Sequence, residues 1–119
     1  MKLLGFAYLA VLLGVNSATA QTTQMQLNYF SDSLCSDYVS SIDVTWATTV
    51  TNGVPGPNCY DYNSASANSV EIANCYENAC ACIFYTEASC QGSQTYAFSN
   101  GTNCLAHAPT LFSFECWYQ

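Results

Sequence analysis

Apolar and polar residues alternate with a period of two along most of the chain after residue 24. Met25, Leu27 and Tyr29 begin the pattern. Later segments place further residues on one face each, namely Ile42, Val44 and Trp46, then Val70 and Ile72, then Phe112, Phe114 and Cys116. Turn-forming pairs separate these segments at Asn52-Gly53, Pro55-Gly56-Pro57, Gln91-Gly92 and Asn100-Gly101. The pattern predicts short, half-buried strands in a small all-β sandwich or barrel.

One segment has an alternative interpretation. In residues 66–81, Val70, Ala73 and Tyr76 are spaced loosely enough for a helical turn. The asparagines and β-branched residues of this segment have low helix propensity, so a strand is favoured.

A short phrase occurs twice in the chain. FYTEASCQG, residues 84–92, matches YFSDSLCSD, residues 29–37, in its two aromatic residues, hydroxyl, acid and cysteine. Asn-Cys pairs follow each copy, at Asn58-Cys59 and at Asn103-Cys104. An internal repeat of this kind predicts two similar halves, residues 25–75 and 80–119, each opening with an aromatic hairpin.

The second copy resembles the Greek-key signature of the βγ-crystallins. In FYTEASCQGS, residues 84–93, a Phe-Tyr pair is followed by Gly92 and Ser93 at the spacing of that signature. The first copy has Asp37 in place of the glycine. The resemblance implies one crystallin-type domain, a small disulfide-rich Greek-key β-sandwich of two similar halves. Such domains often bind calcium, but the nearest string, residues 36–41, begins with serine, so no metal or cofactor is expected.

The N-terminus has the features of a secretory signal peptide. A short basic start precedes the apolar run 3–15, and Ala18-Thr19-Ala20 supplies small residues for cleavage. We expect a signal peptide over residues 1–20, one disulfide-stabilised β domain over residues 21–119, and a secreted, extracellular protein.

Eight cysteines follow the predicted signal peptide, which is typical of a small secreted domain with four disulfides. They are Cys35, Cys59, Cys75, Cys80, Cys82, Cys90, Cys104 and Cys116. The sequence does not choose among the 105 pairings that eight cysteines allow. Cys80 and Cys82 precede the second hairpin and have no counterparts in the first half. We therefore expect both to face one side and to tie the second half to the first or to the connecting segment.

The charge of the chain excludes several partners. The sequence holds eight acidic residues and one basic residue, Lys2, which lies in the predicted signal peptide. Binding of nucleic acid and insertion into anionic membranes both depend on cationic side chains, so neither is expected.

Little in the sequence indicates catalysis. Asp32 and Glu87 occupy equivalent positions of the repeat, which suggests a role in the turns. His107, the one histidine, lies in the loop-like segment AHAPT. We expect no enzymatic activity.

The segment 53–63 has the best material for binding. Its prolines restrict the chain, and it ends in Tyr60, Asp61 and Tyr62, which could contact a sugar or a protein. Alternatively, Tyr60 and Tyr62 pack on the edge of the sandwich and the segment is a plain connection. Asn100-Gly101-Thr102 is a glycosylation sequon in a predicted exposed turn, so Asn100 is a candidate acceptor.

The mature chain as a whole resembles the small secreted cysteine-rich proteins of filamentous fungi, many of which are candidate effectors. This resemblance implies a non-enzymatic, monomeric binding protein that acts on a host protein or a cell-wall glycan. The alternatives are an antimicrobial protein resembling killer toxins, a small protease inhibitor and a structural protein of the cell wall.

Overall fold

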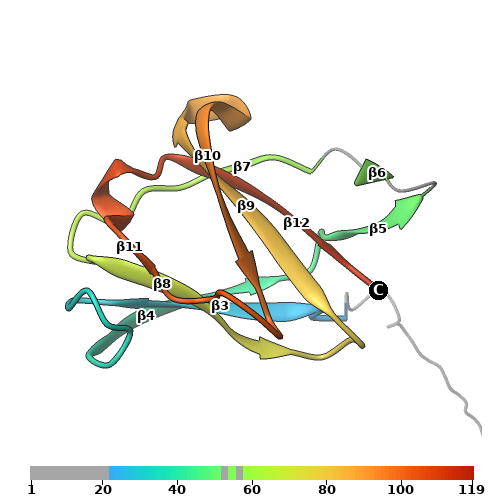
Figure 1. The fold of residues 1–119 in the computed structure, drawn as a ribbon, viewed down its shortest axis with the longest axis horizontal. Helices are drawn as coiled ribbons and strands as arrows, with labels where there is room; N and C mark the ends of the chain where they lie inside the picture. Colours follow the sequence, from blue (N-terminus) through green and yellow to red (C-terminus); the bar gives the residue numbers. More distant parts are fainter. Residues whose placement is uncertain (1–21, 52–53, 56–57) are drawn as a thin grey trace, which may run out of the picture.

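The computed structural model describes residues 22–51, 54–55 and 58–119, which form two packed β-sheets (Figure 1). The helical segments in this part of the chain are two short 3-10 turns, Ala88–Cys90 and Ala108–Thr110. The prediction of a small, disulfide-rich, all-β fold is therefore confirmed. The predicted signal peptide, residues 1–20, lies outside the described residues.

The first sheet has four antiparallel strands in the order β11-β8-β3-β4. Their bounds are Leu105–Ala106 (β11), Ser69–Cys75 (β8), Met25–Phe30 (β3) and Tyr38–Val44 (β4). Strand β8 lies in the segment 66–81, so the favoured interpretation of that segment is confirmed. Its β-branched residues, Val70 and Ile72, are buried on the inner face of the sheet.

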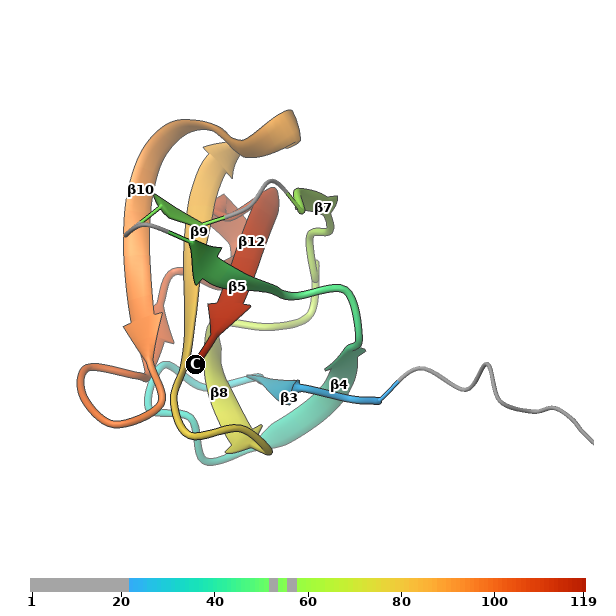
Figure 2. The same cartoon turned by 90° about the vertical axis from the view of Figure 1, so that its right-hand side faces the viewer.

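The second sheet has six strands, with β10, β9 and β12 side by side (Figure 2). The bounds are Gln91–Phe98 (β10), Cys80–Glu87 (β9), Ser113–Tyr118 (β12), Thr48–Thr51 (β5), Val54–Pro55 (β6) and Tyr60–Asp61 (β7). Two strands pair with the edge of β12 that faces away from β9. Antiparallel β7 pairs with its first residues, and parallel β5 pairs with its last.

The core lies between the two sheets and follows the predicted alternation with one exception. Met25, Leu27 and Val44 are fully buried. Phe112, however, was expected to share the inner face of its strand and is instead 44% exposed. The 3-10 turn before it directs Leu111 into the core, and β12 begins only at Ser113.

Both copies of the repeated phrase form hairpin turns, and a buried serine braces each turn. Between β3 and β4, the Oγ of Ser69 accepts a hydrogen bond from the Cys35 N–H at 3.1 Å and donates to the Asp32 carbonyl. Between β9 and β10, Ser113 makes the same two contacts with Cys90 and Glu87.

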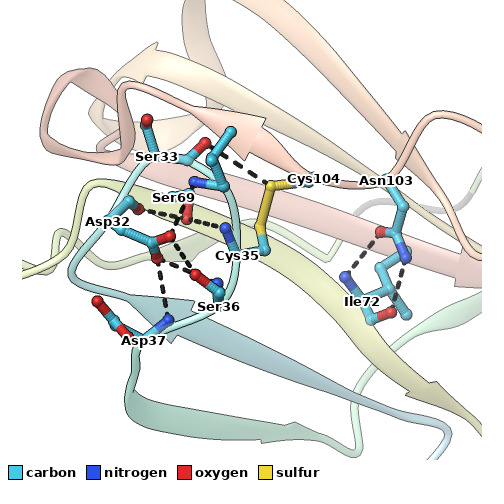
Figure 3. Close-up of a disulfide and its surroundings, with 10 residues drawn as sticks. Asp32, Ser33, Cys35, Ser36, Asp37, Ser69, Ile72, Asn103 and Cys104 are labelled. Carbon is cyan, nitrogen blue, oxygen red and sulfur yellow. Dashed lines mark hydrogen bonds between the residues drawn. A yellow bond between two sulfur atoms is a disulfide. The ribbon is translucent and has the colours of Figure 1, made fainter.

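Residues 25–75 and 80–119 each contribute a strand that pairs with the last strand of the other segment. Strand β7, from the first half, pairs with β12, and β11, from the second half, pairs with β8. An asparagine before each contributed strand fixes it to the other segment. Asn103 bonds both backbone groups of Ile72 at 2.8 Å (Figure 3). Asn58 does the same to Cys116. Strands β5 and β6 have no counterpart in the second half.

The eight cysteines form four disulfides, so the predicted framework is confirmed. The pairs are Cys35–Cys104, Cys59–Cys90, Cys75–Cys80 and Cys82–Cys116. The first two link the halves, and the third spans the connecting segment.

The expectation that Cys82 also leaves its own half is wrong. Cys82 stands directly opposite Cys116 on the neighbouring strand, with Cα atoms 4.1 Å apart, and forms its disulfide there. Cys80 and Cys82 are both buried in the core cluster, as expected of residues that share one face of a strand.

Candidate functional site

Strand β7 carries two of the three predicted binding residues and is held at several points. Asn58, just before it, donates to the Cys116 carbonyl at 2.7 Å and accepts from the Cys116 N–H at 2.8 Å. Cys59 is bonded to Cys90 in the turn between β9 and β10. These contacts anchor the candidate site to two different elements of the sandwich.

Tyr60 lies at the sandwich edge with part of its ring accessible. The ring stacks on Trp46 with centroids 4.5 Å apart and packs against Phe114 at 5.5 Å. The residue remains 39% exposed. Because one side of the ring is packed against other aromatic side chains, a ligand that contacts Tyr60 meets a positioned surface.

Asp61 is exposed and faces the neighbouring turn. Its Oδ1 accepts a hydrogen bond from the Ser89 N–H at 2.8 Å. Ser89 and Cys90 both have left-handed backbone conformations, with φ of 60° and 57°. Cys59, Tyr60, Asp61 and Ser89 line an open hollow of about 390 Å³. Because successive side chains of a strand point to opposite faces, the Asp61 carboxylate faces this hollow, whereas the Tyr60 ring packs on the other face of β7 against Trp46 and Phe114.

Tyr62 points toward the interior and does not line this hollow. It is partly buried against the core, with its ring 5.2 Å from that of Tyr29. Its N–H donates to the Phe112 carbonyl at 3.0 Å. Of the three candidate residues, Tyr60 and Asp61 are therefore both exposed at the sheet edge, on opposite faces of β7, and Tyr62 is used for packing.

Sequence reasoning did not assign Trp46 or Ser89 to this site. Trp46 carries the stack beneath Tyr60, and its Nε1 is buried without a hydrogen-bond partner among the described residues. The period-two pattern identified Trp46 only as a residue of an inner face. Ser89 enters the site through the Cys59–Cys90 pairing, which the sequence left open.

The carboxylate of Asp32 has a structural role in its turn, in accord with its position in the repeat. It accepts hydrogen bonds from the Ser36 hydroxyl and from the N–H groups of Leu34, Ser36 and Asp37 (Figure 3). These bonds, the Ser36 hydroxyl first, hold the pKa of Asp32 well below its ordinary value. Glu87 contributes its backbone carbonyl to the matching turn.

His107 is exposed, as expected of a loop residue, and has a left-handed backbone with φ of 64°. It lines an open hollow of about 400 Å³ with Ser33, Asn68, Pro109 and Thr110. Ser33 and Thr110 supply hydroxyl groups, but none of the described residues that line this hollow is a carboxylate that could orient the imidazole as in a triad.

Three further observations concern ligands and membranes. Asn100 is exposed in the turn after β10, where a glycosyl acceptor is accessible. Within residues 22–51, 54–55 and 58–119, no group of three or more His, Cys, Asp or Glu side chains could hold a metal ion. No helix in the same part of the chain is long and apolar enough to cross a membrane.

Comparison with known proteins leaves the site to be interpreted from its own geometry. No family model matches the chain, and no curated protein or solved structure matches it either.

Proposed function

We propose that this protein is a secreted, monomeric recognition protein that acts outside the cell by binding rather than catalysis. The partner is a host protein or a cell-wall glycan, and the role is that of a fungal effector. Four disulfides in a domain of this size are typical of proteins that work in an oxidising, extracellular environment.

One observation carries the binding proposal. The Cys59–Cys90 disulfide fixes strand β7 to the β9–β10 turn, so Asp61 on one face of the strand and Tyr60 on the other are both held at the sheet edge. A carboxylate and a partly exposed aromatic ring that are both held in place at one sheet edge are suited to docking, because little conformational entropy is lost on binding.

Three features favour binding over acid–base chemistry. Burial raises the pKa of Tyr29 and raises that of Tyr85 to about 12, so both phenols stay protonated near neutral pH. Partial burial raises the pKa of Glu71, but Glu71 lines neither the hollow at Tyr60 nor that at His107. The carboxylate of Asp32 is committed to its turn.

A leaf infiltration assay tests the proposal. Oxidised protein is expected to alter cell death or the chitin-triggered oxidative burst, whereas reduced and alkylated protein has no effect. Asp61→Asn keeps an oxygen for the Ser89 N–H but removes the charge, and we expect it to weaken the response at least threefold. Asp43→Asn is the matched control, because Asp43 is also exposed and also accepts one hydrogen bond, from Gln26.

Other results would redirect the assignment. No response across several plant hosts contradicts the effector role. Equal activity of Asp61→Asn and Asp43→Asn contradicts the site. Growth arrest of rival microbes would identify a toxin. Formation of a stoichiometric complex with a protease would identify an inhibitor, and binding to wall glycans alone would identify a structural protein.

A further inference from the structure

The outer face of the second sheet carries a groove between two aromatic side chains. Phe98 on β10 and Trp117 on β12 both pair with Ala81 on the strand between them, so the three side chains point to the same face. The small Ala81 forms a floor between the two larger residues. The groove measures about 250 Å³, and Ala79, Cys80, Asn100 and Gln119 complete its lining.

The acceptor asparagine of the sequon lies at this groove because of the turn that follows β10. The Gly101 N–H donates to the Phe98 carbonyl at 3.2 Å, and the Phe98 N–H donates to the Thr102 carbonyl at 2.8 Å. These bonds bring the sequon next to Phe98. Asn100, Gly101 and Thr102 are all exposed, so a glycosyltransferase can reach them.

The chemistry of the groove matches N-acetylglucosamine, the sugar that is attached to asparagine in N-linked glycans. Its ring has a face of C–H groups that packs on aromatic side chains, and its hydroxyl and acetamide groups need hydrogen-bonding partners. Phe98 is 39% exposed, and its ring is supported by Tyr96 with centroids 6.0 Å apart. Gln119, which carries a side-chain amide, lies in the same lining. Apolar walls with a few polar groups are typical of small-ligand sites.

We propose that Asn100 carries an N-linked glycan whose first N-acetylglucosamine lies in this groove against Phe98 and Trp117. The inference rests on the secretory route in the proposed function. The glycan covers an apolar part of the surface and stabilises the folded domain, which gives the modification a structural role.

The test begins with the full chain expressed with its own N-terminus in yeast. The intact mass of the secreted protein should show one glycan, which Asn100→Gln removes. One endoglycosidase trims the glycan to a single N-acetylglucosamine, and an amidase removes it completely. We expect the trimmed protein to keep the Tm of the full glycoform, and loss of the last sugar to lower it by about 4 °C.

Two variants locate the effect. In Phe98→Ala, the Tm difference between the trimmed and sugar-free forms should shrink by at least half. Phe112→Ala is the matched control, because it removes an equally exposed aromatic side chain next to the other end of β12. Asn100→Gln provides a sugar-free reference without the new carboxylate that the amidase leaves.

The outcomes separate this inference from the proposed function. Secretion of protein with unmodified Asn100 contradicts the proposed glycan. Equal Tm values for the trimmed and sugar-free forms contradict the place of the first sugar in the groove. Retention of the chain inside the cell contradicts secretion instead. In that event, a host leader in place of residues 1–20 still delivers the domain for the same Tm measurements.

Discussion

At the residue scale, Asp32 shows how one carboxylate organises an exposed turn. Its oxygens accept hydrogen bonds from three backbone N–H groups and one hydroxyl. The ionised form accepts these bonds better than the protonated form, which explains the lowered pKa. The folded state therefore gains stability wherever Asp32 is ionised.

This linkage predicts a defined pH dependence. The stabilisation from Asp32 is fully present above its ordinary pKa of 3.8 and is lost as the pH falls through the lowered value. Asp32→Asn should lower the free energy of unfolding at pH 6 and flatten its decline below pH 4. Urea denaturation at several pH values measures both effects. If the free energy of unfolding of Asp32→Asn declines as steeply in acid as that of the wild type, the linkage is absent. Asp43→Asn is the control for the loss of one negative charge.

At the element scale, Ser69 and Ser113 join each hairpin turn to the strand beside it. Both serines are fully buried, and each donates one hydrogen bond and accepts another. An alanine in either place leaves a backbone N–H and a carbonyl of the turn without that partner.

Removal of the hydroxyl oxygen from either serine should therefore destabilise the folded state substantially. Ser69→Ala and Ser113→Ala should each lower the free energy of unfolding by about 1–3 kcal/mol. Ser66→Ala, at an exposed turn position, should stay within about 0.5 kcal/mol of the wild type. Chemical denaturation of the three variants measures the differences. Equal stabilities would show that neither buried serine supports its turn.

The sequence was informative about strands and faces because both depend on local alternation. Met25, Leu27, Val70 and Ile72 all lie where the period of two predicted them. The Cys59–Cys90 pair could not be predicted, because it depends on which sheet receives β7. The hollow beside β7 depends on the same pairing, so the sequence identified Tyr60 and Asp61 but not Ser89, which also lines it. The Greek-key assignment stays a prediction of the resemblance.

At the scale of the whole molecule, the charge is almost entirely of one sign. The described residues include eight carboxylates, one histidine and no lysine or arginine. No lysine or arginine in this part of the chain offsets the repulsion among these carboxylates. Repulsion of this kind opposes the compact state and is screened by salt.

Salt should consequently stabilise the protein. Raising NaCl from about 10 mM to about 0.5 M shortens the screening length several-fold and should raise the Tm by about 2–5 °C at pH 7. The shift should disappear at pH 3, where most carboxylates are protonated. Calorimetry at the two pH values measures this. A salt effect of the same size at both would rule out repulsion as its source.

The disulfides and strand pairs between distant segments also determine what happens when a protease cleaves one peptide bond. Cys35–Cys104 spans every peptide bond between residues 35 and 104, and Cys82–Cys116 covers the rest as far as residue 116. A single break anywhere in that range leaves both fragments covalently attached. Each fragment also keeps strands that belong to the sheets of the other. A clipped molecule therefore remains a single two-chain particle that a sizing column cannot distinguish from the intact one.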